Sequence, residues 1–357
     1  MWGIFPSHHD KSKKPNMKTV TRLFKDNSLT KRKYPMFKSP LRLSIVLACC
    51  ALGTLSGCEP EITKIEDTQP LEKLIVIEHN LGATTISHRP QRVAALDMNE
   101  VDFLDQLNVP ISGMVKDFVP HFLAKYKDTP EIADLGAIVQ PNMEKIYALK
   151  PDLVLMTPLH ANQYEELSQL APTLHFDISY RNSRDHHVDT IKKHLVELGE
   201  IFEKQELAQQ KVAEIDAKVA EVRAVTKERS EKALVVMHNN GAFSSFGVES
   251  RYGFVFDVLG VKAASEKVET GLHGQPISSE FISQADPDIL YIIDRTAVME
   301  GKPVIDAEHL ANPLLRQTKA WKNDNVVFVD ADAWYITSAS ITSLKIIIDD
   351  ILKGYQS

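Results

Sequence analysis

Few residues of this 357-residue chain are suited to covalent or metal chemistry. Of its three cysteines, Cys49 and Cys50 lie in an apolar run and Cys58 follows that run. Outside the apolar run Cys58 is the only cysteine, and a single cysteine can form neither an internal disulfide nor a thiolate metal site. The chain also contains no GxSxG, P-loop or GxGxxG motif. We therefore expect a protein that is not an enzyme, because a hydrolase or a nitrogenase-type component would need such motifs or cysteines.

Three histidines come closest to a metal cluster. His186 and His187 are adjacent, and His194 follows a short distance along the chain. All three fall at the start of a long helical stretch, away from the strand ends where a ligand is expected. We therefore expect solvated histidines here rather than a metal site.

Residues 187–228 have the composition of one long helix. The stretch contains no proline and a single glycine, Gly199, and its apolar residues recur mostly at intervals of three and four. About forty helical residues would span roughly 60 Å, which exceeds the width of one small domain. Such a helix predicts a folded module at each of its ends.

The segments on the two sides of this helix repeat one pattern. Glu144 and Glu280 each open a short helical run, and each run leads through Pro-Asp into an apolar run of strand type. Strand and helical patterns alternate in both segments, which is typical of a mostly parallel sheet covered by helices. The sequence predicts an α/β fold of two Rossmann-like lobes, residues 73–186 and 229–357, joined by one long α-helix. A cleft between the lobes is the expected ligand site.

The second lobe shows the alternation in detail. An apolar run predicts a strand over residues 232–238, and the glycine-containing stretch 241–247 predicts a loop. Residues 252–260 are expected to form a short helix closed by a glycine. A terminal helix is expected over residues 342–352.

The first 57 residues differ in composition from the rest. They hold 11 Lys and Arg but 2 Asp, so the remaining chain has a formal net charge of −16. A polyanionic surface argues against nucleic acid as a partner. Residues 36–57 have the basic, apolar and small-residue regions of a secretory signal peptide. We interpret residues 1–35 as an upstream extension before a start at Met36, and residues 58–72 as a polar tether.

The chain from about Lys73 to Ser357 resembles the periplasmic siderophore-binding lipoproteins of ABC transporters. Several motifs carry the resemblance together: residues 90–96 (PQRVAAL), 149–154 (LKPDLV), 239–244 (NNGAFS), 250–254 (SRYGF), 273–275 (HGQ), 294–295 (DR) and 334–335 (WY). Leu-Ser-Gly-Cys at residues 55–58 resembles a bacterial lipobox, which implies a lipid on Cys58. The anchor would hold the protein at the periplasmic face of a membrane, and we favour the inner membrane.

This resemblance implies a carrier that binds a ferric siderophore in the interlobe cleft. The protein would deliver that ligand to an inner-membrane permease and its ATPase, as a monomer with no covalent cofactor beyond the lipid. A carrier of haem, cobalamin, zinc or manganese on the same scaffold is the alternative. Direct metal-ion binders need several histidines and carboxylates that converge on the cleft, and only His273 is well placed for this.

Arg251 and Arg295 match arginines that face the ligand in the catecholate binders. Guanidinium groups suit phenolate oxygens because their donors are planar and stay charged. Related binders bring a third arginine from the first lobe, but residues 157–162 (TPLHAN) contain none. This departure favours a less negative ligand, a mixed catecholate-hydroxamate siderophore such as anguibactin. His160 and Tyr164 stand near the missing arginine and are weaker candidates for the pocket.

His273 and Tyr335 match a histidine and a tyrosine that can complete the iron shell in related binders. Imidazole and phenolate are competent Fe(III) ligands. A siderophore that fills the shell by itself would leave both residues to line the pocket instead. Trp334 is expected either to stack on an aromatic ring of the ligand or to pack in the core.

Glu144 and Glu280 occupy equivalent places in the two repeats. They resemble the surface glutamates, one per lobe, that dock such proteins on arginines of the permease. The competing interpretation is an ordinary glutamate in the first turn of a helix, where the helix dipole favours it.

Overall fold

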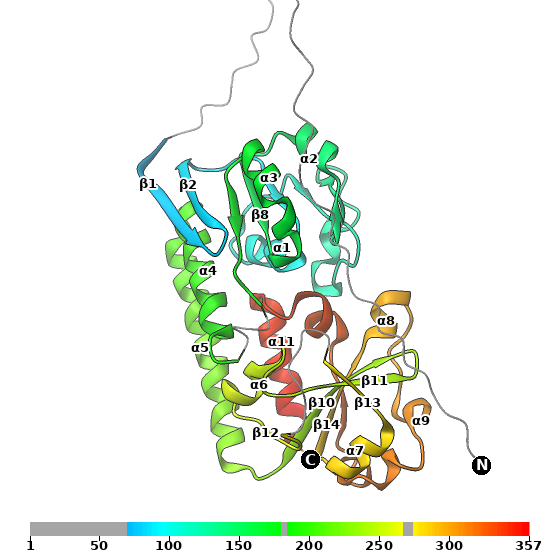
Figure 1. The fold of residues 1–357 in the computed structure, drawn as a ribbon. Helices are drawn as coiled ribbons and strands as arrows, with labels where there is room; N and C mark the ends of the chain where they lie inside the picture. The colour runs from blue at the N-terminus through cyan, green and yellow to red at the C-terminus, as the bar shows by residue number, and fades with distance from the viewer. Residues whose placement is uncertain (1–69, 180–183, 267–273, 357) are drawn as a thin grey trace, which may run out of the picture. The chain divides into compact units, whose positions relative to one another are not determined.

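The structure is a computed structural model that describes residues 70–179, 184–266 and 274–356. Residues 64–357 form one compact unit (Figure 1). The predicted signal peptide, Cys58 and nearly all of the predicted tether lie outside the described residues, so these predictions stay untested.

The N-terminal lobe contains β1 (Pro70–His79), β2 (Gly82–His88), β3 (Val93–Ala95), α1 (Met98–Gln106), β4 (Gly113–Met114), η1 (His121–Tyr126), β5 (Ala133–Asp134), β6 (Gly136–Ala137), β7 (Gln140–Pro141), α2 (Met143–Leu149), β8 (Leu153–Met156), η2 (Pro158–Gln163), α3 (Tyr164–Leu170) and β9 (Thr173–His175). Its central sheet has the order β5-β4-β3-β8-β9 and is parallel throughout. The pairs β1–β2 and β6–β7 are antiparallel. Every residue of β3 and β8 is buried, which explains their continuous apolar sequence.

The C-terminal lobe contains β10 (Lys232–Asn239), β11 (Ala242–Phe246), α6 (Gly253–Asp257), β12 (Lys262–Ala263), β13 (Gln275–Ile277), α7 (Ser279–Ala285), β14 (Ile289–Asp294), α8 (Arg295–Glu300), α9 (Ala307–Leu310), η3 (Leu315–Gln317), α10 (Lys319–Lys322), β15 (Val326–Phe328), η4 (Asp332–Thr337) and α11 (Ile341–Lys353). Its sheet has the order β13-β11-β10-β14-β15, with β12 beside β10. Strands β10, β14 and β15 are parallel, so their carboxyl ends meet at one edge.

The loop predicted at residues 241–247 is wrong, because most of it forms strand β11. Asn239 pairs with Ala242 across a two-residue turn in which Asn240 has φ 49° and Gly241 has φ 83°. Asn-Gly between strand residues is a strong hairpin signal, since both positions need positive φ. The dipeptide was the signal that would have predicted the strand.

The repeat predicted around Glu144 and Glu280 is confirmed as a structural repeat. Helices α2 and α7 have the same length, and each begins at a side-chain cap, from Asn142 and Ser278 respectively. Each ends at a residue in the left-handed conformation and leads through Pro-Asp into a buried strand. One local design therefore builds both lobes.

The single helix predicted over residues 187–228 is broken in two. Helix α4 (His187–Ile201) and helix α5 (Gln205–Glu228) form an antiparallel hairpin, because Lys192 of α4 contacts Asp216 of α5 at 2.9 Å. The chain reverses where Glu203 adopts φ 56°. Gly199 allows the close approach, since a Cβ there would lie 2.6 Å from that of Ala208. The apolar periodicity of the sequence continues through this turn, so it did not indicate a break in the helix.

Helix α5 is the long element that packs against α4 and against α11 of the C-terminal lobe (Figure 1). Its Lys218 forms an ion pair with Asp349 of α11, and Thr226 donates a hydrogen bond to the carbonyl of Leu259. The lobes also meet directly, because the buried carboxylate of Asp102 accepts hydrogen bonds from the backbone and hydroxyl of Thr342 at 2.7 and 2.6 Å. The predicted fold class, two α/β lobes with mostly parallel sheets and a long helix, is confirmed.

Candidate functional site

Arg295, Tyr335 and Asn239 come together at one edge of the C-terminal sheet. Arg295 donates from Nε to the hydroxyl of Tyr335 at 2.7 Å and from Nη1 to Oδ1 of Asn239 at 3.0 Å. Its guanidinium carbon lies 5.2 Å from the centroid of the Tyr335 ring, within the range of a cation–π contact. Asn239 ends β10, Arg295 follows β14 and Tyr335 belongs to η4 beyond β15. The parallel strands therefore deliver all three side chains to the same edge.

Arg251 approaches the same tyrosine from another element. Its Nη2 donates to the backbone carbonyl of Tyr335 at 3.2 Å and to Oγ of Ser338 at 3.1 Å. Its guanidinium carbon lies 5.8 Å from the Tyr335 ring centroid. The structure thus brings together three of the predicted residues, Arg251, Arg295 and Tyr335, and all three are partly exposed. Their contact with a ligand stays a prediction.

The partners of Arg295 are electrically neutral. Within the described ranges its side chain forms no ion pair, and its two hydrogen bonds go to a phenol and an amide. The nearby carboxylate of Asp294 is occupied, because it caps α8 and lies 3.1 Å from Nδ1 of the buried His238. The positive charge of Arg295 is therefore available to an anionic group brought by a ligand.

Trp334 does not face a ligand, and the expectation that its ring stacks on one is corrected. Its side chain is fully buried, between the rings of Tyr252 and Tyr291. The indole N–H donates to Asp350 at 2.9 Å, which satisfies the one polar atom of the ring. The alternative of core packing, left open by the sequence, is what the structure shows.

His160 and Tyr164 are also structural in this conformation. His160 is fully buried, and its Nε2 lies 2.7 Å from the carbonyl of Ile138 while its Nδ1 accepts from the backbone of Thr157. Tyr164 contacts the ring of His79 from the β1–β2 hairpin. Among the hydrogen bonds and ring contacts of the described residues, none joins either side chain to the arginine cluster, so the structure gives no support to their predicted place in the pocket.

The expectation of three solvated histidines is wrong for two of them. His186 is exposed, but His187 and His194 are buried. His194 lies 2.9 Å from the buried carboxylate of Glu100 and stacks on Phe176. Burial raises the pKa of Glu100, and the contact with His194 acts against that shift. The apolar periodicity alone did not reveal that α4 packs His194 against the N-terminal lobe and His187 against Phe254 of the C-terminal lobe.

His187 is a buried neutral side chain beside the site. Its Nε2 donates to the carbonyl of Ser338 at 2.9 Å, and its ring stacks on Phe254 at 4.0 Å. Burial lowers the pKa of His187 to about 4. The hydrogen bond that the ring donates to the carbonyl of Ser338 acts against this shift, and the charge of Arg251 adds to it.

This lowered pKa makes stability depend on pH. In the unfolded chain His187 binds a proton below about pH 6.5, whereas the folded protein binds it only near pH 4, so stability falls as pH drops through that window. We expect His187→Gln, which keeps a donor for Ser338, to remove about 2–3 kcal/mol of the loss between pH 7 and pH 4.5. Urea unfolding at pH 7 and at pH 4.5 measures the free energy of unfolding of the wild type and the variant. The exposed His186→Gln is the control, and an unchanged pH dependence in His187→Gln would contradict the assignment.

Two predicted residues cannot be placed. His273 and Cys58 lie outside the described residues, so their roles stay predictions. Among the described residues, no group of three or more His, Cys, Asp or Glu side chains could hold a metal ion. A helix long and apolar enough to cross a bilayer is also not found in the described part of the chain.

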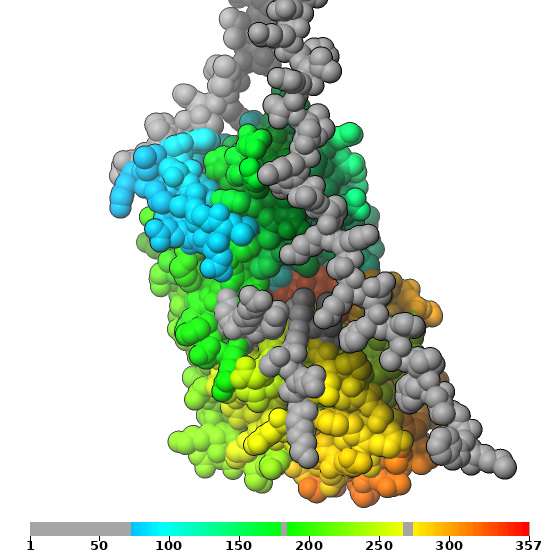
Figure 2. Space-filling view, viewed as in Figure 1, coloured from blue at the N-terminus to red at the C-terminus, as the bar shows by residue number. Residues whose placement is uncertain are grey.

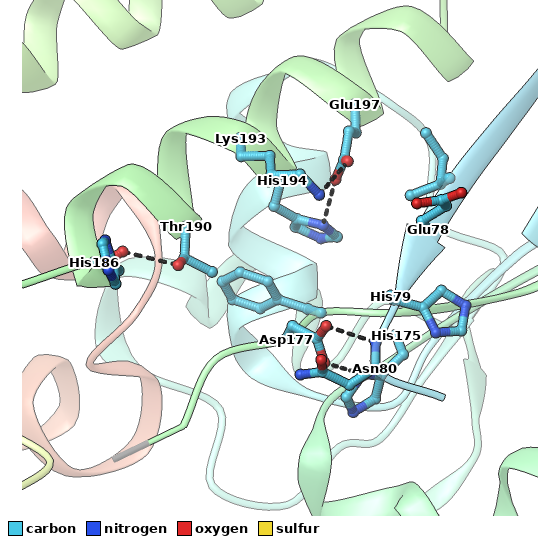
Figure 3. Close-up of a pocket in the computed structure, with 12 residues that line it drawn as sticks. Glu78, His79, Asn80, His175, Asp177, His186, Thr190, Lys193, His194 and Glu197 are labelled. Carbon is cyan, nitrogen blue, oxygen red and sulfur yellow. Dashed lines mark hydrogen bonds and ion pairs between the residues drawn. The ribbon is translucent and has the colours of Figure 1, made fainter. Parts of the chain in front are cut away.

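A cavity of about 320 Å³ lies in the N-terminal lobe (Figure 3), and its lining contains none of Arg251, Arg295 and Tyr335. It opens between the β1–β2 hairpin, the end of β9 and the first turns of α4. Carboxylates of Glu78, Asp177 and Glu197 outnumber its one lysine, Lys193. This lining does not favour an anionic ligand, so we regard the arginine cluster as the better candidate site.

Sequence reasoning missed two residues of the site, Asn239 and Ser338. Asn239 was part of a motif but was given no role, and it holds Arg295. Ser338 has φ 20° after the π-helical turn η4 and receives a hydrogen bond from Arg251. Nothing in the local sequence indicates a π-helix, although such turns are frequent at functional sites.

The fold and the site define a class of protein: a two-lobed, helix-linked binding protein with a cationic cluster at the sheet edge of one lobe. A family model for periplasmic binding proteins matches residues 93–333. The chain belongs to this periplasmic binding protein family.

Two relatives of the chain are named for the ligands that they bind. The chain is 80% identical over 322 residues to the ferric-anguibactin-binding protein FatB of Vibrio anguillarum, a match that covers 90% of this chain and 100% of the relative. It is 28% identical over 316 residues to the petrobactin-binding protein YclQ of Bacillus subtilis, across 87% of this chain and 98% of YclQ.

Two solved structures of binding proteins have a fold similar to that of this chain. The siderophore-binding protein BauB, bound to ferric iron and two molecules of acinetobactin, superposes with a TM-score of 0.76 at 66% identity, covering 80% of this chain and 99% of BauB. The crystal structure of YclQ gives a TM-score of 0.74 at 29% identity, covering 80% of this chain and 100% of YclQ.

Proposed function

We propose that this protein is the siderophore-binding component of an ABC iron-uptake system and holds its ferric ligand against Arg251, Arg295 and Tyr335. The observation that carries the proposal is the pair of guanidinium groups on one tyrosine, of which Arg295 has only neutral partners among the described residues. The ligand is a mixed catecholate-hydroxamate complex of the anguibactin or acinetobactin type. The relatives FatB and BauB support this choice.

The geometry accounts for binding of an iron-loaded anion. Each arginine has five N–H donors in a planar fork, and the bonds to Tyr335, Asn239 and Ser338 use only part of them. The remaining donors of Arg295 can meet phenolate oxygens of the ligand with charge-assisted hydrogen bonds.

Tyr335 has two possible roles, and they differ in chemistry. Its oxygen accepts a hydrogen bond from Arg295, so its own hydroxyl proton can be donated to the ligand. If the siderophore leaves a coordination position on the iron, the same oxygen can bind Fe(III) as phenolate, with Arg295 balancing its charge. His273 would then be a second candidate ligand.

Delivery requires a membrane partner. We propose that a lipid on Cys58 anchors the protein to the periplasmic face of the inner membrane and that the protein acts as a monomer without an enzymatic step. Glu144 and Glu280, both exposed in the first turns of the equivalent helices α2 and α7, are proposed to dock on arginines of the permease. Their equivalent positions in the repeat support this role.

A fluorescence titration tests the binding function. The chain from residue 59 onward contains two tryptophans, Trp321 and Trp334, whose emission reports on the C-terminal lobe. We expect ferric anguibactin to quench this emission with sub-micromolar affinity, and Zn²⁺ and Mn²⁺ to leave it unchanged. Tight binding of a free metal ion or of haem, with no response to ferric siderophores, would favour the alternative carriers instead.

A further inference from the structure

The turn that carries Tyr335 is unusual in its backbone. Residues Asp332–Thr337 form the π-helical turn η4, and Ser338 follows it with φ 20°. A π-helical turn is rare, and a residue with a side chain seldom adopts positive φ, so neither persists without support from surrounding groups. Figure 2 shows the dark red C-terminal segment at the surface between the green and yellow parts of the molecule. The support therefore has to be sought in both lobes.

The start of η4 is held by the N-terminal lobe. The backbone N–H of His121, the first residue of η1, donates to Oδ2 of Asp332 at 2.9 Å. The ring Nε2 of His121 lies 2.7 Å from Oδ2 of Asp330. The other oxygen of Asp330 accepts the backbone N–H of Ala333 at 2.9 Å. One residue of the N-terminal lobe thus contacts both carboxylates that begin the turn.

The end of η4 is held by the N-terminal lobe as well. Oδ1 of the buried Asn99 accepts the backbone N–H of Ala339 at 3.1 Å. The amide of Asn99 is oriented for this, because its NH₂ group donates to Oδ1 of Asp97 at 2.7 Å. Oδ2 of Asp97 in turn accepts the hydroxyl of Thr157 at 3.2 Å. A chain of buried hydrogen bonds from β3 and β8 therefore reaches the end of the turn.

From these contacts we infer that Asn99 and His121 are positioning residues for the siderophore site, although they belong to the opposite lobe from its arginines. They hold the two ends of η4, and Tyr335 lies between them. Arg251 donates to the carbonyl of Tyr335 and to Ser338, so it moves with the same turn. This inference rests on the proposed function, because it assumes that Tyr335 and Arg251 contact the ligand.

These contacts couple the two lobes. A change in the relative position of the lobes pulls on η4 through His121 and Asn99, and so alters the geometry of Tyr335 and Arg251. The C-terminal lobe carries the cationic groups, but their arrangement depends on contacts supplied by the N-terminal lobe. Affinity is therefore coupled to interlobe contact without any ligand contact from these two residues.

The first experiment needs no ligand. Hydrogen exchange of the full ligand-free chain is compared for wild type, Asn99→Ala and His121→Ala. We expect the backbone amides of residues 333–339 to exchange about tenfold faster in both variants, because local opening becomes easier. Asn312→Ala and His309→Ala are matched controls, since these residues make similar contacts within the C-terminal lobe, to Ser279 and Asp306. Unchanged exchange at residues 333–339 would overturn the inference.

The second experiment separates positioning from a general loss of stability. Dissociation constants for ferric anguibactin are measured for Asn99→Ala in the wild-type background and in the Tyr335→Phe background. We expect about tenfold weaker binding in the first and no more than about threefold in the second, because residues that act through one another are not additive.

The outcomes of this cycle are distinct. An equal loss from Asn99→Ala in both backgrounds would show that Asn99 does not act through Tyr335, and would overturn the inference while leaving the proposed function intact. A wild-type protein that binds no ferric siderophore would overturn the proposed function, and the positioning role with it. Faster exchange in the first experiment would then show only that the N-terminal lobe supports η4.

Discussion

Replacing Arg251 and Arg295 together by alanine is expected to weaken binding of ferric anguibactin by more than about 100-fold. Each guanidinium supplies charge-assisted hydrogen bonds worth about 1.5–3 kcal/mol, and each 1.4 kcal/mol is tenfold in affinity. Arg295 should matter strongly by itself, because among the described residues its charge meets only the neutral partners Tyr335 and Asn239. Fluorescence titration of the single and double variants measures the effect.

Two further variants show whether the effect is specific. Arg295→Lys keeps the charge but not the planar fork, and we expect a loss of about tenfold. Arg316→Ala removes an exposed arginine that lies over Trp321 in the same lobe, and should leave affinity unchanged. Circular dichroism confirms that each variant is folded. Retention of near-wild-type affinity in the double variant would exclude the arginine cluster as the ligand site.

Trp334→Ala is expected to cause the largest loss of stability of any substitution discussed. Removing a fully buried aromatic ring costs about 3–5 kcal/mol through lost packing and the cavity that remains. The carboxylate of Asp350 also loses the indole N–H that it accepts at 2.9 Å. Chemical denaturation of the variant measures the change. The control Trp321→Ala, a partly exposed side chain, should cost about 1 kcal/mol.

A second measurement decides the role of Trp334 if the alanine variant fails to fold. In Trp321→Phe protein from residue 59 onward, the emission of Trp334 is isolated. We expect this emission to resist quenching by iodide both before and after ferric anguibactin is added, because the ring is buried. Ready quenching by iodide would show that the ring reaches solvent, and stacking on the ligand would again be a candidate.

Residues far apart in the sequence explain why the histidines were misjudged. His187 and His194 lie on a helix whose composition is that of a solvated surface, yet Phe254 and Phe176 cover them in the folded protein. The polar partners that make their burial tolerable are the carbonyl of Ser338 and the carboxylate of Glu100. The sequence of α4 alone does not indicate these partners, because other segments of the chain supply them.

The break between α4 and α5 has a similar origin. Helical propensity and apolar periodicity run through Glu203 without interruption, and neither Pro nor Gly marks the turn. Packing decides the outcome, since the hairpin brings Gly199 against Ala208 and buries apolar faces of both helices. Tertiary contacts therefore overrode a strong local preference for one straight helix.

By itself the sequence determined the α/β class, the two lobes and the repeat around Glu144 and Glu280, because periodicity, Pro-Asp punctuation and caps are local signals. The motifs also singled out Arg251, Arg295 and Tyr335. Only the tertiary structure decided that these three meet, that Trp334 belongs to the core, and that the turn bearing Tyr335 is held by Asn99 and His121. The physical reason is that a side chain is buried or hydrogen-bonded by residues of other segments. Those segments come together only when the chain folds.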